Sequence, residues 1–223
     1  MSASPLDLLA HQIRPAAGVP DGALVLLHGR GTSEHDLLPL IDALDPERRL
    51  VGVAPRGPLT IGGFPGAHWY VVRRVGFPDD ATFAPTYARL AAWLDALPDA
   101  LGVPWSRTVL GGFSQGTAMS FALGLGPDRP APAGILALSG FMPEVPGFEP
   151  VLDGRAGFPV AIAHGSEDPV IPVAFGRSAR DRLAAAGADV LYRESPVGHT
   201  IDPALIPELR DWLVQRLPAG SAR

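Results

Sequence analysis

The sequence predicts an α/β protein in which a mostly parallel sheet carries helices on both faces. Short apolar runs of strand length recur along the whole chain, and amphipathic segments with helical spacing lie between them. Neighbouring parallel strands need a crossover connection, which a helix usually provides, so this alternation favours a wound sheet over a sandwich. A chain of 223 residues is compatible with one such domain covering residues 1–223 and leaves no room for a large lid domain.

The strands are predicted where a short apolar run is closed by Gly, Pro or charged residues. These runs are Ala23–Leu27, Arg49–Ala54, Thr108–Gly111, Ile135–Leu138, Val160–Ala163 and Asp189–Arg193.

The helices are predicted between these strands, where apolar residues recur at helical spacing. They are Glu34–Leu44, Phe83–Leu97, Gln115–Leu125, Val173–Ala186 and Pro203–Leu217. Gly187 follows the fourth of them and is typical of a helix C-cap. Residues 60–80 show no pattern of either kind, and we expect a long loop there, of the sort that is often functional.

The composition limits the classes of partner. Hydrophobic residues make up 47% of the chain and charged residues 18%, which excludes a disordered or collagen-like protein. The net charge of -5 argues against nucleic acid, because phosphate binding needs a basic surface. The absence of Cys excludes disulfides and a Cys nucleophile. We find no signal peptide and no apolar run long enough to span a membrane, so we expect a cytoplasmic protein.

A serine lies in the motif G-x-S-x-G at the junction of a predicted strand and a predicted helix. The motif is Gly112-Phe113-Ser114-Gln115-Gly116. In a nucleophile elbow the serine occupies a strained strand-to-helix turn, and glycines are needed where neighbouring side chains would clash. The preceding strand and the following helix are the context that this motif requires, so Ser114 is the candidate nucleophile.

A serine hydroxyl is a weak nucleophile and needs a base, which in turn needs a carboxylate to orient it. In elbow-containing folds both partners follow the serine in the chain. Of the six histidines only His164 and His199 do so, and His199 lies in the loop before the last helix. Asp168 lies in the loop after a strand, which predicts the order Ser114, Asp168, His199. Glu167 and, less directly, Asp202 are alternative carboxylates.

The oxyanion of an acyl-transfer reaction needs two backbone N–H donors. One comes from the residue after the nucleophile and the other from a loop after an early strand. Gln115 fits the first position. Arg30, between Gly29 and Gly31 after the strand Ala23–Leu27, fits the second, because the flanking glycines allow the backbone to approach a substrate closely.

Five blocks of sequence together resemble the phospholipase/carboxylesterase family of α/β-hydrolases, which includes acyl-protein thioesterases and small bacterial carboxylesterases. The blocks are Leu27–Gly31, Ala54–Pro58, Gly111–Gly116, Leu138–Phe141 and His164–Val170. The resemblance implies an α/β-hydrolase fold, a triad of Ser114, Asp168 and His199, and oxyanion amides at Arg30 and Gln115. It also implies that no metal or organic cofactor is used.

We therefore expect a serine carboxylesterase that hydrolyses small to medium acyl esters through an acyl-enzyme intermediate. Trp69, Phe141 and Met142 are candidate substrate-binding residues, since the family has acyl-pocket residues near Trp69 and the other two follow a strand's carboxyl end. The alternatives are a thioesterase, a lysophospholipase or a perhydrolase on the same triad, or a non-catalytic binder on the same fold. The expected partner is a small ester, with a homodimer left open.

Overall fold

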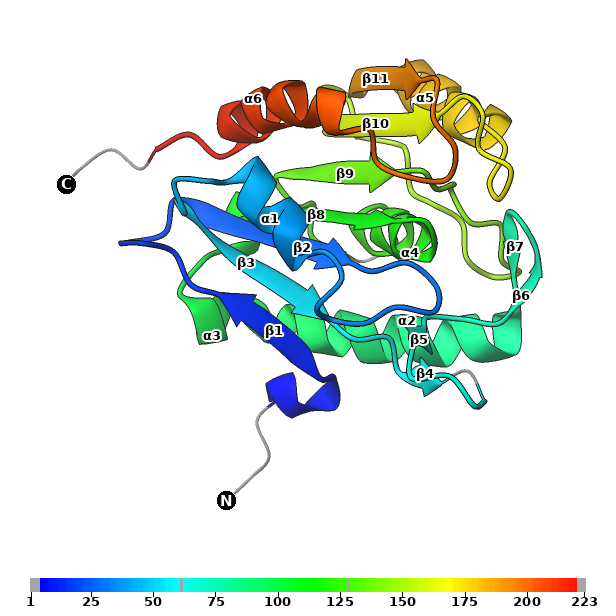
Figure 1. Ribbon diagram of the computed structural model, residues 1–223, viewed down its shortest axis with the longest axis horizontal. Helices are drawn as coiled ribbons and strands as arrows, with labels where there is room; N and C mark the ends of the chain where they lie inside the picture. The colour runs from blue at the N-terminus through cyan, green and yellow to red at the C-terminus, as the bar shows by residue number, and fades with distance from the viewer. Residues whose placement is uncertain (1–4, 61, 128, 220–223) are drawn as a thin grey trace.

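The central element of the fold is a seven-stranded sheet, and all of its strands except β1 point their carboxyl ends toward one side of the molecule (Figure 1). The structure is a computed structural model that describes residues 5–60, 62–127 and 129–219. The strand order is β1-β3-β2-β8-β9-β10-β11, and all neighbouring pairs are parallel except β1 with β3. Its strands are β1 (His11–Arg14), β2 (Gly22–Leu27), β3 (Leu50–Pro55), β8 (Thr108–Phe113), β9 (Gly134–Leu138), β10 (Pro159–Gly165) and β11 (Asp189–Ser195).

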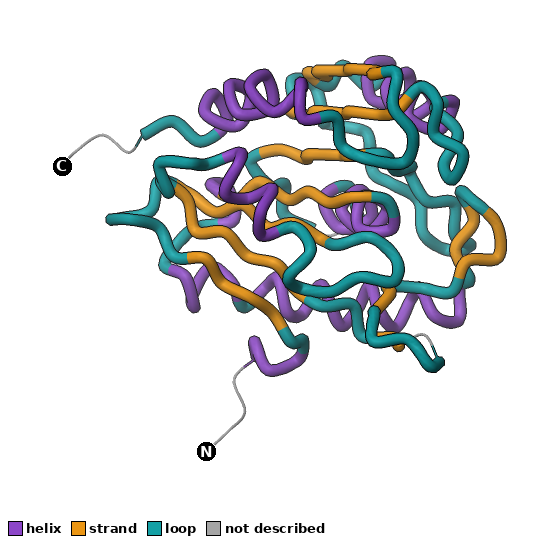
Figure 2. Tube along the Cα trace, viewed as in Figure 1, coloured by secondary structure: helices purple, strands orange, loops and turns teal. Residues whose placement is uncertain are grey.

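Helices cover both faces of this sheet, because successive strand residues point to opposite faces and both sets are apolar (Figure 2). Leu24 and Leu26 of β2 pack with α1 and α6, whereas Val25 and Leu27 pack with α2 and α4. The helices are α1 (Leu38–Leu44), α2 (Asp80–Asp95), α3 (Leu97–Leu101), α4 (Gln115–Gly124), α5 (Ala174–Ala185) and α6 (Ile206–Arg216). Short 3-10 turns are η1 (Pro5–Leu8), η2 (Trp105–Arg107) and η3 (Pro203–Leu205).

The expected fold class, a mostly parallel sheet between helices without a large lid domain, is confirmed for the part of the chain that the structure describes. Each of the six predicted strands is present, with ends that differ by a few residues at most. The assignment of residues 1–223 to one domain stays a prediction.

Some predicted boundaries were wrong for identifiable local reasons. The first helix begins at Leu38 rather than Glu34, because residues 33–36 form a turn in which the Asp36 N–H donates to the Ser33 carbonyl. The second begins at Asp80 rather than Phe83, because the Asp79 side chain accepts a hydrogen bond from the Thr82 N–H and caps it.

The segment 60–80 is not a patternless loop. It contains parts of two small antiparallel hairpins, which are β4 (Leu59–Thr60) with β5 (Ala67–His68), and β6 (Val72–Arg74) with β7 (Phe77–Pro78). The first hairpin is tied to the loop after β2, since the Gly31 N–H donates to the Ala67 carbonyl and the Ala67 N–H to the Thr32 carbonyl. The chain between β3 and α2 is therefore anchored beside the end of β2.

Candidate active site

Ser114 lies in the sharp turn between β8 and α4, at the carboxyl edge of the sheet. Its φ of 57° and ψ of -116° are unusual for a residue with a side chain and cost about 1–3 kcal/mol. The neighbouring glycines explain how the turn is tolerated. A methyl group at Gly112 would lie 2.4 Å from the Gly116 carbonyl carbon, and one at Gly116 would lie 1.9 Å from the Leu27 carbonyl oxygen. The motif thus has the strained geometry that the sequence predicted.

The His199 imidazole lies between Ser114 and Asp168 and is hydrogen-bonded to both. Its Nε2 is 3.0 Å from Ser114 Oγ, and its Nδ1 is 2.7 Å from Asp168 Oδ2. His199 comes from the loop between β11 and η3, and its ring lies 4.8 Å from the Phe113 ring, centroid to centroid. Three side chains from distant parts of the chain therefore form one hydrogen-bonded row, in which a base can take the serine proton and a carboxylate can orient the base.

Asp168 is buried, and both of its carboxylate oxygens are hydrogen-bonded. Oδ1 accepts from the backbone N–H groups of Val170 and Ile171, each at 2.8 Å, while Oδ2 faces His199. Burial alone would raise the pKa of Asp168, but the hydrogen bonds from His199, Ile171 and Val170 outweigh it, so its pKa lies below the usual range. The carboxylate is therefore ionised at neutral pH.

The alternative carboxylates do not reach the imidazole. Glu167 is exposed, and Asp202 accepts a hydrogen bond from the Ala204 N–H and caps η3. The other histidine after Ser114, His164, is buried with its Nε2 2.8 Å from the Ile171 carbonyl oxygen, on the backbone that also binds Asp168. Among the described residues no cluster of three or more acidic or histidine side chains could hold a metal ion.

The two predicted oxyanion donors belong to segments that meet at Ser114. Gln115 is the first residue of α4, so its backbone N–H has no acceptor within the helix. The loop after β2 also approaches Ser114, because a methyl group added to Gly29 would lie 3.6 Å from Ser114 Cβ. Arg30 follows Gly29 directly. The structure thus brings both peptide groups to the nucleophile, and their role as donors stays a prediction.

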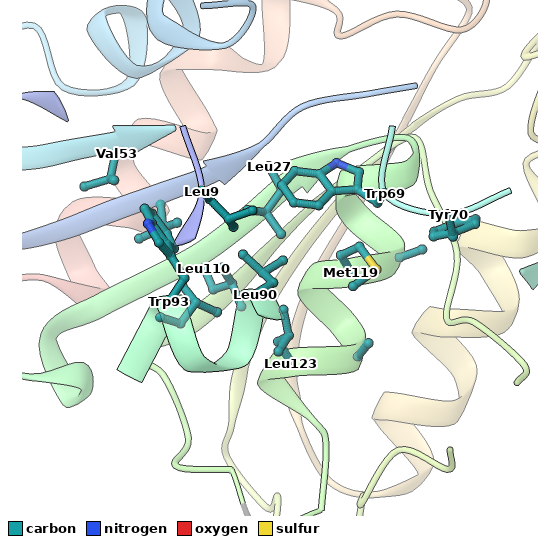
Figure 3. Packing of buried hydrophobic residues seen from close by; sticks show 14 of the residues in the cluster. Leu9, Leu27, Val53, Trp69, Tyr70, Leu90, Trp93, Leu110, Met119 and Leu123 are labelled. Carbon is teal, nitrogen blue, oxygen red and sulfur yellow. The ribbon is translucent and has the colours of Figure 1, made fainter. Parts of the chain in front are cut away.

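The three candidate substrate-binding residues differ in their surroundings. Trp69 has an exposed fraction of 0% and belongs to the apolar cluster between the sheet and helices α2 and α4 (Figure 3). Its indole N–H donates to the His28 carbonyl oxygen at 2.8 Å. This burial favours a supporting role for Trp69 over a place in the pocket wall.

Phe141 and Met142 follow β9 in an irregular segment, directly after Gly140. Phe141 is buried, with its ring 5.7 Å from that of Phe175. Met142 and Phe175 line a cavity of about 190 Å³, which shares Arg182 and other lining residues with a neighbouring cavity of about 650 Å³. Substrate contacts for Phe141 and Met142 stay predictions.

Two side chains that support the site were not identified from the sequence. The Gln115 side chain accepts from the Trp69 N–H at 3.1 Å and donates to the Tyr70 carbonyl at 2.8 Å. Thr117 Oγ1 lies 2.6 Å from the Gly112 carbonyl oxygen and 2.7 Å from that of Leu138, which connects α4 to β8 and β9. A threonine in a helix made mostly of small and apolar residues is the signal that could have suggested Thr117.

Comparisons with known proteins show the family that the chain resembles. The family model described as Phospholipase/Carboxylesterase matches residues 10–215. Acyl-protein thioesterase 1 of Gibberella zeae is 26% identical to the chain, over 94% of this chain and 97% of that protein. The crystal structure of esterase PE8 is 27% identical with a TM-score of 0.76, over 94% of this chain and 99% of that one. No helix in the described residues is long and apolar enough to cross a membrane.

The fold is shared with a further solved structure, the Bacillus cereus carboxylesterase. It is 24% identical with a TM-score of 0.81, over 93% of this chain and 94% of that one, which shows that the fold is common to both. With the family match over residues 10–215 and the α/β-hydrolase sheet, the chain belongs to the phospholipase/carboxylesterase family and is a serine hydrolase.

Proposed function

We propose that this chain is a serine carboxylesterase that hydrolyses small to medium acyl esters through a covalent acyl-enzyme. The observation that supports this most directly is the His199 imidazole, which lies within hydrogen-bond distance of both Ser114 Oγ and Asp168 Oδ2. This is the arrangement that a nucleophile, base and orienting carboxylate require.

The reaction has two steps in this proposal. His199 Nε2 takes the proton of Ser114 while the serine oxygen attacks the ester carbonyl carbon. The Arg30 and Gln115 N–H groups bind the oxyanion that forms, and the alcohol leaves with the proton that His199 returns. Water then repeats the sequence on the acyl-enzyme, which releases the acid and restores Ser114. Ionised Asp168 stabilises the imidazolium that is formed in each step.

The fold supports a preference for acyl groups of limited size. The segment between β3 and α2 contributes only short hairpins near the site, and no large separate lid domain is inserted in the described residues. The cavity of about 190 Å³ beside Met142 could receive an acyl chain that extends past Phe141. A cytoplasmic location and a homodimer belong to the same proposal.

A second candidate activity is thioester hydrolysis by the same residues. It is favoured by the curated relatives, which include acyl-protein thioesterase 1 of Gibberella zeae at 26% identity. Attack on a thioester needs the same nucleophile, base and oxyanion donors, so the same residues would serve both activities.

Two measurements test the proposal. The first is labelling by a fluorophosphonate probe together with the turnover of Ser114→Ala, which should lose the label and at least about 10³ of the activity. A mutant that keeps more than a tenth of the activity would show that Ser114 is not the nucleophile. The second is a panel of matched esters and thioesters of increasing acyl length, in which faster ester turnover with short chains is expected.

A further inference from the structure

The carbonyl oxygen of Gly29, in the loop that carries Arg30, is held by two side chains. His28 Nδ1 lies 2.6 Å from it, and the Thr32 hydroxyl donates to it at 3.0 Å. Thr32 Oγ1 is also 3.2 Å from His28 Nδ1, so the three groups form a closed cluster. A carbonyl with two donors in a short loop has little freedom to rotate, and the orientation of its peptide group is therefore determined.

The protonation state of His28 follows from its other neighbour. The Gly57 backbone N–H donates to His28 Nε2 at 2.9 Å, so Nε2 must be unprotonated. The ring is then neutral with its proton on Nδ1, where it donates to the Gly29 carbonyl. Burial lowers the pKa of His28 and agrees with this neutral form. His28 is thus a fixed donor with one tautomer.

The position of the Gly29 carbonyl determines the direction of the Arg30 N–H. The two groups belong to the same peptide, and no peptide bond in the described residues is cis. In a trans peptide the C=O and N–H point in opposite directions. A carbonyl directed at His28 and Thr32 therefore directs the Arg30 N–H away from them. Gly29 itself faces Ser114, because a methyl group placed on its Cα would lie 3.6 Å from Ser114 Cβ.

We propose that His28 and Thr32 are positioning residues that hold the Gly29–Arg30 peptide with its N–H directed at the developing oxyanion. The inference rests on the proposed function, because it assumes that the Arg30 amide is an oxyanion donor. Neither side chain touches the substrate; both act through the peptide between them. If the peptide rotated, the Gly29 carbonyl would face the oxyanion, and attraction would become repulsion.

Trp69 connects this arrangement to the second donor. Its indole N–H donates to the His28 carbonyl, while its backbone N–H donates to Gln115 Oε1. Trp69 thus connects Gln115, whose backbone amide is the proposed second donor, to His28, which orients the amide of the first donor, Arg30. Preorganised donors need no rearrangement during the reaction, which is why such fixed dipoles stabilise a transition state strongly.

The test compares Thr32→Val with Thr32→Ser. Valine has the shape of threonine without its hydroxyl, and serine restores the hydroxyl without the methyl group. Loss of a whole oxyanion donor costs about 10²–10³ in kcat, so loss of one of the two groups that hold it should cost about tenfold, with KM unchanged. Thr32→Ser should return kcat to within about twofold of the wild type.

The matched control is Thr108→Val, which removes a hydroxyl that donates to the Pro104 carbonyl at 3.3 Å, at the amino end of β8. It should lower the melting temperature by about as much as Thr32→Val while leaving kcat unchanged.

As a second readout, a trifluoromethyl ketone that forms an oxyanion on Ser114 should bind Thr32→Val about tenfold more weakly than it binds the wild type, whereas a product carboxylic acid should bind both equally well.

Two results would overturn the inference. The first is a Thr32→Val enzyme whose kcat stays within twofold of the wild type. The second is a loss of kcat that appears equally in Thr108→Val, since this would reflect general destabilisation. Either result leaves the proposed function intact provided that Ser114→Ala is inactive. Substantial activity in Ser114→Ala would instead refute the proposed function itself.

Discussion

The hydrogen bonds of Asp168 predict a large loss of activity for the substitution Asp168→Asn, because they determine how the new side-chain amide must be oriented. Asp168 Oδ1 accepts two backbone N–H groups, from Val170 and Ile171, and Oδ2 accepts the Nδ1–H of His199. An asparagine has one oxygen and one NH₂ group for these three donors. If its NH₂ took the Oδ1 position, it would oppose two fixed backbone donors. The amide should therefore keep its oxygen there and turn its NH₂ toward His199.

This orientation changes the tautomer of His199. Facing an NH₂ donor, Nδ1 must accept, so the proton of the neutral ring moves to Nε2, which then faces Ser114 with a donor instead of a lone pair. The ring can no longer act as a base. Loss of the correct tautomer in a serine triad costs about 10⁴ in kcat, equivalent to about 5.4 kcal/mol of transition-state stabilisation. The fold should be little affected, since both backbone donors keep their acceptor.

Hydrolysis of a chromogenic ester, measured as kcat and KM, checks this prediction. Thermal unfolding should show that Asp168→Asn is folded. Glu167→Gln is the matched control, because it makes the same chemical change in the neighbouring exposed carboxylate and should leave kcat within about twofold of the wild type. If Asp168→Asn kept more than a tenth of the wild-type kcat, or if Glu167→Gln were the more damaging change, the reasoning from the Asp168 hydrogen bonds would be refuted.

Three further predictions follow from the same site. As the pH falls, kcat/KM should fall along a single acid limb, because protonation of a histidine base removes the lone pair that accepts the serine proton, while Asp168, with its lowered pKa, stays ionised. A second acid limb just below the first would contradict this. Gly116→Ala should lower the free energy of unfolding, measured by urea denaturation, by at least about 1–3 kcal/mol, because the new methyl group would lie 1.9 Å from the Leu27 carbonyl oxygen. An unchanged free energy of unfolding would contradict that close approach. EDTA should leave turnover unchanged, because a serine and not a metal-bound water is the proposed nucleophile, and inactivation would refute this.

The parts of the fold that the sequence could predict are those with strong local patterns. Five of the six predicted strands were recognisable because their residues are buried and mostly apolar on both faces, as expected for the interior of a parallel sheet. The sixth, β11, is a partly exposed edge strand. The row Ser114, Asp168 and His199 was predictable because the motif defines the nucleophile and the chain order limits its partners. The structure brings these three side chains together.

Other parts depend on contacts that leave no local pattern. The edge strand β1, His11–Arg14, was missed because its four residues include three polar ones and its register is determined by pairing with β3. Trp69 was interpreted as a candidate pocket residue because the family that the sequence resembles has acyl-pocket residues in this region. The structure places its side chain in the core, directly after the hairpin β4–β5, and a substrate contact stays a prediction. Such a position is determined by long-range pairing and not by the neighbouring sequence.

Glycines allow the chain to pack closely around Ser114. A methyl group at Gly140 would lie 2.9 Å from the Ser114 carbonyl oxygen, and one at Gly29 would lie 3.1 Å from the Phe113 ring. With Gly112 and Gly116, these positions let three segments of the chain approach Ser114 closely. Each approach brings backbone groups to the serine, and fixed backbone dipoles stabilise a developing oxyanion without moving. Larger residues at these positions should therefore reduce catalysis by displacing the backbone, even where the hydrogen bonds among Ser114, His199 and Asp168 survive.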